Sequence, residues 1–431
     1  FRMSENRNIS DFPEVPENPI VLVTGASGYV ALHCVQQLLA AGYRTRGTVR
    51  SLRNKAKVEP LREFPNQGLL ELVEADLEKP EDWSNVVDGC TYILHVASPW
   101  PIVADERTIE VAVKGTMSVL QAAARCPTVR KVVMTSSCAA INDGHKNDEK
   151  IFDENCWSDL KSKKIENYAK SKTLAEKTAW DFWSSLPKES RFRFTVLNPT
   201  FVTGPVLSTV DHGSATIVGR MMDFRTFLAA PKVCLGVVDV RDVAKAHLIS
   251  LTTPESDGER ILITHQRPTW FFDFRNWLME EFKDYGYLIS PIVTPDWLLK
   301  LYAKTKIDPQ SSAVVHRIGP ELKFSNEKSR KLLNMDYINP QKSVIEMVYS
   351  MIEKGMIRKP PLRKFKKNKL NKCHPEKNKP QTARAAGGSS MTTLMQTLFA
   401  QLTIGIAPLR ESQDSFAAKG KFLKYIGLLS N

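Results

Sequence analysis

Short apolar runs alternate with longer segments of helical periodicity from residue 19 onward. The run PIVLVT at 19–24 predicts a buried strand, and the segment 29–41 predicts a helix. Further strands are predicted at 44–49, 69–74, 92–97, 131–136 and 194–198. Strands that alternate with helices form βαβ units around a parallel sheet, and strands that are apolar on both faces are covered by helices on both sides. The pattern therefore predicts an α/β fold with a doubly wound parallel sheet.

The alternation becomes less regular after Gly204 and Pro205. Helices are predicted at 213–230, 243–252, 270–283, 295–306, 326–335 and 343–354, and a strand at 260–264. We interpret this part as a smaller α/β substrate lobe packed over the carboxyl edge of the sheet. The predicted divisions are a polar extension at 1–18, the sheet domain at 19–205, the lobe at 206–357, from which the chain can return to the sheet domain, and a tail at 358–431.

The net charge of +13 is concentrated in that tail. Residues 358–431 hold 15 Lys and Arg but 3 Asp and Glu, so the first 357 residues are almost neutral. We expect a solvated, disordered extension; a tether to an anionic membrane or an acidic partner is the second interpretation. Nucleic acid is not an expected partner, because Phe365 alone offers little base stacking. The run 391–409 is long enough to span a membrane, but its polar residues favour an amphipathic or disordered stretch.

The composition is that of a globular protein, with 42% hydrophobic and 25% charged residues. The seven cysteines are widely spaced and form no CxxC pair, which favours reduced thiols and a cytoplasmic location. Residues 1–18 contain no apolar run typical of a signal peptide. The eight histidines show no metal-ligand spacing, so no metal site is expected. The oligomeric state expected is a monomer or a homodimer.

The first chemical motif, TGASGYVA, lies at 24–31 between a predicted strand and a predicted helix. In such a motif Gly25 permits a tight turn, Gly28 lets the backbone approach a pyrophosphate, and Ala31 is small enough for the helix to pack closely on the strand. The helix amino terminus also favours the phosphate charge. The alternative is an ordinary turn. The placement favours a dinucleotide site and thus a Rossmann-type, NADP-binding domain at 19–205.

The cofactor preference depends on the end of the second predicted strand. NAD-preferring sites usually carry a carboxylate there for the ribose 2′-hydroxyl, whereas this chain has Arg50, followed by Lys57. Two cations favour a 2′-phosphate and therefore NADP(H), although Lys57 could also be a solvated helix residue. Asp76, after the third strand, either accepts a hydrogen bond from the adenine amino group or caps its own loop.

The second motif, Tyr168 and Lys172, places a phenol and an ammonium four residues apart on one face of a predicted helix. A neighbouring cation favours the phenolate and can make a tyrosine a useful acid and base. The same spacing occurs at Tyr302 and Lys306, so spacing alone does not distinguish them. Tyr168 follows Ser137, which ends a predicted strand at the carboxyl edge of the sheet, where ligands bind in doubly wound folds. This context favours Tyr168.

The motifs together resemble the extended short-chain dehydrogenase/reductases, of the NAD-dependent epimerase/dehydratase superfamily. Within them the chain is similar to the dihydroflavonol reductase-like group, which includes cinnamoyl-CoA reductases and yeast-type methylglyoxal/ketone reductases. The stretches that carry this resemblance are VTGASGYVA (23–31), GTVR (47–50), HVASP (95–99), VVMTSS (132–137), YAKSKTLAEKTAWDF (168–182), NPTFVTGP (198–205), VVDVRDVAKAHL (237–248) and SNEKSRKLLNM (325–335).

The resemblance implies roles for individual residues. Tyr168 protonates the carbonyl oxygen, Lys172 lowers the pKa of that tyrosine and binds ribose, and Ser137 hydrogen-bonds the substrate oxygen. The cofactor-binding residues implied are Gly25, Ser27, Gly28, Tyr29, Val30, Arg50, Lys57, Asp76, Leu77, Val96, Ala97, Tyr168, Lys172, Pro199, Thr200 and Val202. Asn142 and Ser98 are substrate-binding candidates, and Asp242 holds the lobe against the sheet domain.

The chain departs from the family pattern at Ala112, where many members have asparagine, so an asparagine-based fourth catalytic element is not expected. The expected function is NADPH-dependent, reversible reduction of a small to medium, apolar aldehyde or ketone. The alternatives are a 3β-hydroxysteroid dehydrogenase-like enzyme, which Arg50 disfavours, and a non-catalytic NADPH-binding sensor or scaffold. The lobe's aromatic residues either line the substrate pocket or, for most of them, pack in the core; they are Trp270, Phe271, Phe272, Phe274 and Trp297.

Overall fold

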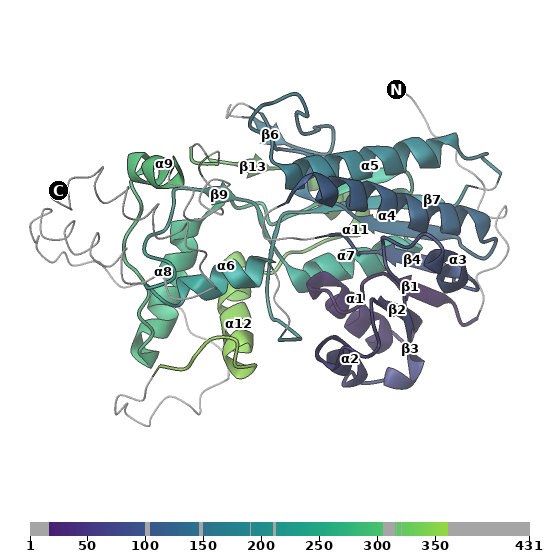
Figure 1. Ribbon diagram of the computed structural model, residues 1–431, viewed down its shortest axis with the longest axis horizontal. Coiled ribbons are helices and arrows are strands. Elements are labelled where there is room, and N and C mark those ends of the chain that lie inside the picture. The colour runs from purple at the N-terminus through teal and green to yellow at the C-terminus, as the bar shows by residue number, and fades with distance from the viewer. Residues whose placement is uncertain are drawn as a thin grey trace, which may run out of the picture.

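A computed structural model of the protein describes residues 17–99, 104–145, 150–189, 191–209, 213–304, 315, 317–319 and 321–360. The central sheet contains β1 (Ile20–Val23), β2 (Arg44–Val49), β3 (Leu70–Glu74), β4 (Tyr92–His95), β5 (Lys131–Thr135), β7 (Arg193–Pro199) and β11 (Glu259–Ile263). All neighbouring strands are parallel, in the order β3-β2-β1-β4-β5-β7-β11 (Figure 1). The strand order reverses beside β1, so the sheet is the doubly wound, Rossmann-like sheet predicted from the alternation, and a ligand crevice is expected at that reversal.

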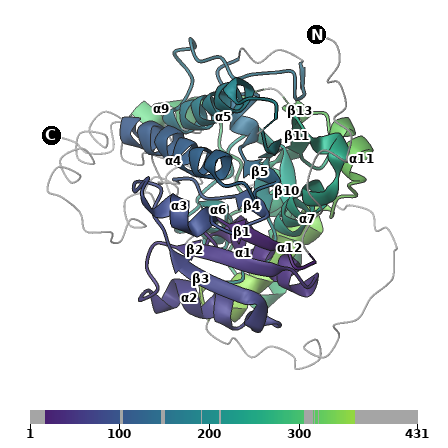
Figure 2. The ribbon, with the colours of Figure 1, turned by 90° about the vertical axis from the view of Figure 1, so that its right-hand side faces the viewer.

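Helices cover both faces of the sheet (Figure 2). One face carries α1 (Tyr29–Ala40), α2 (Lys55–Arg62), α7 (Val240–Thr252) and α11 (Glu327–Leu333). The other carries α3 (Asp82–Val87), α4 (Glu106–Arg125) and α5 (Asn167–Ser185). Successive strand residues point to opposite faces: Val21 and Val23 enter the first core and Leu22 enters the second. Strands buried on both sides are therefore apolar at every position, which is the pattern seen in the sequence.

A smaller lobe lies beside the carboxyl edge of the sheet, at the left of Figure 1. Its helices are α6 (Gly213–Met221), α8 (Phe271–Phe282), α9 (Asp296–Lys304) and α12 (Pro340–Glu353). Three two-stranded pairs accompany them: β8 (Phe201–Thr203) with β10 (Val237–Asp239), β9 (Cys234–Leu235) with β12 (Thr269–Trp270), and β6 (Ile151–Phe152) with β13 (Lys323–Phe324). Short 3-10 turns occur in the described residues of both the sheet domain and the lobe: η2 (Gln67–Leu69), η3 (Cys138–Ala140), η4 (Pro254–Ser256) and η5 (Lys283–Tyr285). The fully buried Phe274, Val344 and Met347 join α8 to α12 in the lobe's core.

Helix caps fix two of the longer helices. Asp105 precedes α4, accepts a 2.8 Å hydrogen bond from the Thr108 backbone N–H, and donates its own backbone N–H to the Thr108 hydroxyl. Asn339 caps α12 in a similar way, and Pro340 occupies its first position. Because each cap satisfies donors that the first helical turn leaves unpaired, it stabilises the helix by about 1 kcal/mol.

The predicted elements match the observed ones except at several ends. The strand predicted at 92–97 ends at His95, because the hydroxyl of Thr24 accepts hydrogen bonds from the next two backbone N–H groups, of Val96 and Ala97. The helix predicted at 213–230 ends at Met221, where the Asp223 carboxylate and carbonyl close a turn. Within the segment 206–357, β11 pairs with β7 and α7 packs on α1, so the chain does return to the sheet.

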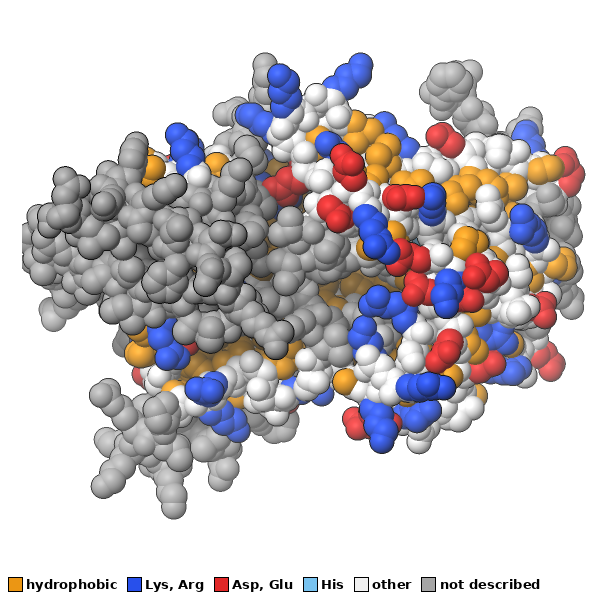
Figure 3. Space-filling model, in the orientation of Figure 1, with side chains coloured by type: hydrophobic (Ala, Val, Ile, Leu, Met, Phe, Trp, Pro, Cys, Tyr) orange, Lys and Arg blue, Asp and Glu red, His pale blue; other side chains and the backbone are white. Residues whose placement is uncertain are grey.

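Blue and red side chains alternate over the visible face of the sheet domain, as expected for a nearly neutral body (Figure 3). No helix in the described part of the chain is long and apolar enough to cross a membrane. The six cysteines that the structure describes are free thiols. Residues 1–16 of the predicted extension at 1–18, and residues 361–431 of the predicted tail at 358–431 with its stretch 391–409, lie outside the described residues.

Candidate active site

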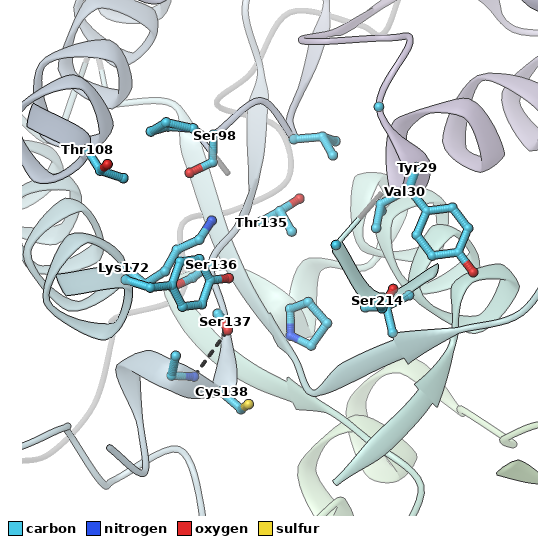
Figure 4. A pocket seen from close by; sticks show the side chains of 18 of the residues that line it. Tyr29, Val30, Ser98, Thr108, Thr135, Ser136, Ser137, Cys138, Lys172 and Ser214 are labelled. Carbon is cyan, nitrogen blue, oxygen red and sulfur yellow. Dashed lines mark hydrogen bonds between the residues drawn. The ribbon is translucent and has the colours of Figure 1, made fainter. Parts of the chain in front are cut away.

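A cavity of about 860 Å³ is lined by residues at the carboxyl edge of the sheet and by residues of the lobe. All the site residues predicted from the sequence line it: Gly25, Ser27, Gly28, Tyr29, Val30, Arg50, Lys57, Asp76, Leu77, Val96, Ala97, Ser98, Ser137, Asn142, Tyr168, Lys172, Pro199, Thr200 and Val202. Figure 4 shows Tyr29 and Val30, from α1, across the cavity from Ser137 and Lys172. The fold thus gathers side chains that are up to 177 positions apart in the sequence into one cleft.

The loop between β1 and α1 forms one end of the cavity. Gly25 has a φ of +64°, and a Cβ placed on it would lie 3.0 Å from the Cβ of Ala97. Its N–H donates to the Thr48 hydroxyl at 2.8 Å, and Gly28 caps α1 without any side chain over the helix end. No acidic residue lies in the first turn of α1, so that helix end remains suited to an anionic group.

Two cations, Arg50 and Lys57, line the same cavity as that helix end. Burial and the adjacent Arg50 guanidinium both lower the pKa of Lys57, so the two positive groups are close enough to repel each other. A bound phosphate between them would relieve this repulsion and form charge-assisted hydrogen bonds. The close-approach glycine, the open helix end and the paired cations together fit a dinucleotide with an added phosphate.

Asp76 accepts a 3.1 Å hydrogen bond from the Glu78 backbone N–H, the loop-capping role that was the alternative to binding adenine. It also lines the cavity, so the two roles are compatible. Its carbonyl accepts a hydrogen bond from the indole of Trp83, which fixes the loop to α3.

Ser137 follows the end of β5 and is nearly buried. Its hydroxyl accepts a 3.1 Å hydrogen bond from the Ala139 N–H and thereby caps the turn η3, which orients the side chain at the cavity wall (Figure 4). Its carbonyl is held by the amide of Asn198 at 3.2 Å. The Ala139 N–H therefore orients the hydroxyl of Ser137, and the Asn198 amide holds the backbone that carries it.

Tyr168 lies in the first turn of α5 and forms a hydrogen bond with Ser137. Burial raises the pKa of the phenol above its usual range, while the hydrogen bond to Ser137 and the charge of Arg317 lower it. Arg317 belongs to the lobe, and its guanidinium lies 3.3 Å from Asp143 and 3.2 Å from Glu166. The cation with the clearer effect on the phenol is thus one that the sequence did not reveal.

Lys172 lies one turn further along α5, with its ammonium 5.9 Å from the ring centre of Tyr168. Burial lowers the pKa of Lys172 to about 8, and the carboxylate of Glu176 raises it. The adjacent His95 is neutral, because burial and the charge of Lys172 lower its pKa to about 3. His95 shares a 3.1 Å hydrogen bond with the hydroxyl of Thr24, so it supports the nucleotide loop.

The end of the cavity nearest Ser137 is lined by residues that the sequence did not single out. They are Cys138, Asp143, Phe152, Glu166, Cys234, Leu235, Arg317, Leu322 and Phe324. The aromatic residues considered for this role lie elsewhere: Phe271 and Phe274 are buried in the lobe's core, and Trp297 is exposed. No local sequence signal marks Phe152 and Phe324, because they come together only through the pairing of β6 with β13.

Asp242, in α7, joins the sheet domain to the lobe. Its carboxylate accepts a 2.8 Å hydrogen bond from the Ile338 N–H, just before α12, and burial raises its pKa to about 6. Of the second Tyr-x-x-x-Lys pair, Tyr302 belongs to α9, and Lys306 lies outside the described residues. Among the described side chains, no group of three or more His, Cys, Asp or Glu could hold a metal ion.

Comparisons with known proteins agree with this architecture. The profile of the NAD dependent epimerase/dehydratase family matches residues 21–263. A cinnamoyl-CoA reductase of Medicago truncatula is 32% identical over 344 residues, covering 78% of this chain and 96% of its own. The NADPH-dependent methylglyoxal reductase of Saccharomyces cerevisiae is 30% identical, covering 75% of this chain and 95% of its own.

Solved structures show the same relation. The crystal structure of yeast methylglyoxal/isovaleraldehyde reductase complexed with NADPH has a TM-score of 0.65 at 27% identity, over 78% of this chain and all of that chain. Among the relatives found by sequence, a dihydroflavonol 4-reductase of Arabidopsis thaliana is 38% identical over a shorter stretch, 45% of this chain and 52% of its own. The chain therefore belongs to the NAD dependent epimerase/dehydratase family, the extended short-chain dehydrogenase/reductases, as an oxidoreductase related to the cinnamoyl-CoA, dihydroflavonol and methylglyoxal reductases.

Proposed function

We propose that the protein is an NADPH-dependent reductase of small to medium, largely apolar aldehydes or ketones, and that it also catalyses the reverse oxidation of the alcohol. The observation that carries the proposal is the convergence of Ser137, Tyr168 and Lys172 in one cavity with the paired cations Arg50 and Lys57. A protein that only senses a dinucleotide has no use for a phenol bonded to a serine hydroxyl at the substrate end.

The preference for NADPH is supported by the two cations, which would meet the 2′-phosphate. It is also supported by the yeast relatives, one of which is named as NADPH-dependent and one of which was solved with NADPH. A 3β-hydroxysteroid dehydrogenase-like enzyme that favours NAD⁺ would need an acidic residue for the 2′-hydroxyl, and Arg50 lies at that position.

NADPH, held by the nucleotide loop, Arg50 and Lys57, would supply the hydride that reduces the carbonyl carbon of the substrate. Tyr168 donates its phenolic proton to the carbonyl oxygen, so the product is an alcohol and the phenolate remains. Ser137 donates a hydrogen bond to the same oxygen and fixes the substrate beside the phenol. Lys172 is expected to hold the nicotinamide ribose and to stabilise the phenolate with its charge.

The substrate class is inferred from the cavity wall. Phe152 and Phe324 are 5% exposed and lie with their ring centres 6.1 Å apart, and Leu322 lies beside them. Asn142 and Ser98 are the proposed polar contacts to the substrate, and both line the same cavity. An apolar wall with a few polar groups is typical of a site for a small, mostly hydrophobic molecule.

The test is NADPH oxidation by the purified full-length chain across a panel of aliphatic and aromatic aldehydes and ketones. We expect turnover of several apolar carbonyl compounds, with a higher kcat/KM for NADPH than for NADH. Tight NADPH binding without turnover of any compound would instead support the sensor or scaffold alternative. Preference for NAD⁺ together with a hydroxysteroid would support the steroid alternative.

A further inference from the structure

Glu176 is a fully buried carboxylate on α5, one turn beyond Lys172. Residues four positions apart on a helix are neighbours, so this carboxylate lies beside the Lys172 ammonium. A buried carboxylate is costly unless it is paired with a cation and accepts hydrogen bonds. The partners of Glu176 therefore indicate why the fold tolerates it.

Those partners come from three adjacent strands. The Ser136 hydroxyl donates to Glu176 Oε2 at 2.5 Å, and the Asn198 amide donates to the same oxygen at 2.8 Å. The Arg260 guanidinium donates its Nε–H to Glu176 Oε1 at 2.5 Å. These donors lie on or directly after β5, on β7 and on β11, so one carboxylate joins three strands to the helix that carries Tyr168 and Lys172.

The same contacts reach Ser137. Ser136 is its chain neighbour, and the Asn198 amide that bonds Glu176 also donates to the Ser137 carbonyl at 3.2 Å. Ser137 follows β5 whereas Tyr168 belongs to α5, so their hydrogen bond depends on how these two elements are held together. Glu176 belongs to α5 and bonds to Ser136 at the end of β5, so it links the two elements.

Arg260 anchors the pair on its other side. Its Nη1 donates to the carbonyls of Glu154 and Cys156 at 2.8 and 2.9 Å, and its guanidinium carbon lies 3.5 Å from the ring centre of Trp157. Glu176, Asn198 and Arg260 do not line the cavity, so they cannot touch the substrate. Any effect on the reaction must act through Ser137, Tyr168 or Lys172.

We propose that Glu176 is a positioning residue for the reaction: its carboxylate fixes the end of β5 against α5 and supplies the counter-charge for the Lys172 ammonium. The inference rests on the proposed function, since it concerns the same reaction.

The electrostatic part follows from the groups around Lys172. These are Tyr168 and Glu176 from α5 and His95 from β4. His95 is neutral throughout the working range, and Tyr168 is neutral in the resting site because its pKa is raised. Burial lowers the pKa of Lys172 to about 8 even with the opposing effect of Glu176, so the Glu176 carboxylate helps to keep the ammonium charged near neutral pH.

The experiment compares the pH dependence of kcat for wild type, E176Q and R260Q, with NADPH and a substrate from the carbonyl panel. Removing the carboxylate charge lets Lys172 lose its proton more readily, so the alkaline limb of E176Q moves to lower pH. For charges about 6 Å apart, at an effective dielectric constant between about 20 and 80, the shift is about 0.5 to 2 pH units. A several-fold lower kcat at the optimum is expected from the loosened junction, with a smaller change in KM.

R260Q should move the same limb in the opposite direction. It removes the cation that competes with Lys172 for Glu176, while three neutral donors, Ser136, Asn198 and Trp180, remain to hold the carboxylate. A merely structural role would lower the melting temperature of both variants without moving their limbs apart. If E176Q does not fold, R260Q still decides, because a wild-type limb in that variant overturns the proposal.

The chain offers a matched control at the other end of β5. Lys131 is 1% exposed and lies 2.5 Å from Asp257, so D257N removes the carboxylate partner of a buried cation outside the cavity. We expect a lower melting temperature and a wild-type pH profile. A shift in D257N equal to that of E176Q overturns the inference alone. Absence of wild-type turnover with every carbonyl compound overturns the proposed function and, with it, the inference.

Discussion

Gly25 offers a sharp test of how the nucleotide loop is built. The G25A substitution has two separable costs. The first is the left-handed backbone at φ +64°, which costs alanine about 1 to 2 kcal/mol. The second is contact, because the new Cβ would lie 3.0 Å from the Cβ and 3.3 Å from the Cα of Ala97.

Ala97 cannot move away freely, since its N–H donates to the Thr24 hydroxyl at 2.9 Å. Breaking such a hydrogen bond costs about 0.5 to 1.5 kcal/mol. If the loop must regain its native shape to bind a pyrophosphate, that cost appears in the dissociation constant, as an increase of about two- to tenfold. The expected result is a lower melting temperature together with weaker NADPH binding.

The control is G42A. Gly42 has a φ of +83° but meets nothing within 4 Å when a Cβ is added, and it does not line the cavity. It should show the backbone cost in thermal unfolding and a wild-type dissociation constant in a fluorescence titration with NADPH. The reasoning is refuted if G25A binds NADPH as tightly as wild type, or if G42A loses the same affinity.

Three further substitutions test the proposed roles. Y168F should lower kcat by about 100- to 10,000-fold, the usual contribution of a general acid, with little change in NADPH affinity; retained turnover would remove Tyr168 from its role. R50A should weaken NADPH binding by about tenfold or more and leave NADH binding unchanged. The control R53A changes an exposed side chain that does not line the cavity, and it should alter neither affinity. If R50A keeps the wild-type ratio of NADPH affinity to NADH affinity, the 2′-phosphate contact is refuted. R317A should move the pH profile of alcohol oxidation to higher pH by less than about 1 unit, because the Arg317 side chain is 42% exposed and solvent screens its charge. A shift to lower pH would contradict the effect of Arg317 on the pKa of Tyr168.

The sheet could be predicted from the sequence because its strands are buried on both faces. Each short apolar run, such as 131–136, lies between two layers of helices, so it can be recognised as a strand from the sequence alone. The ends of elements could not be predicted in this way. The strand that ends at His95 stops because of the hydroxyl of Thr24, the residue directly after the neighbouring strand β1, which only the folded sheet brings near.

The candidate site likewise contains residues that could be predicted from the sequence and residues that could not. Residues that follow the strands at the carboxyl edge, such as Gly25 and Ser137, could be proposed from the order of strands and helices alone. Arg317 could not, because it reaches the cavity from the lobe and is recognised only by its contacts with Asp143 and Glu166. Core packing was the role predicted for most of the aromatic residues at 270–274, and Phe271 and Phe274 do lie in the lobe's own core.

The raised pKa of Tyr168 bears on the direction of the reaction. In the reduction the phenol gives its proton to an oxygen that is becoming an alkoxide, a far stronger base than a phenolate, so a raised pKa does not prevent the transfer. In the oxidation the phenolate must form first, and at neutral pH only a small fraction of Tyr168 is ionised. We therefore expect alcohol oxidation to rise with pH from 7 to 9 while carbonyl reduction holds level or falls as Lys172 loses its proton, measured as initial rates in both directions. Parallel profiles would mean that bound cofactor lowers the pKa of the phenol more than the protein alone can.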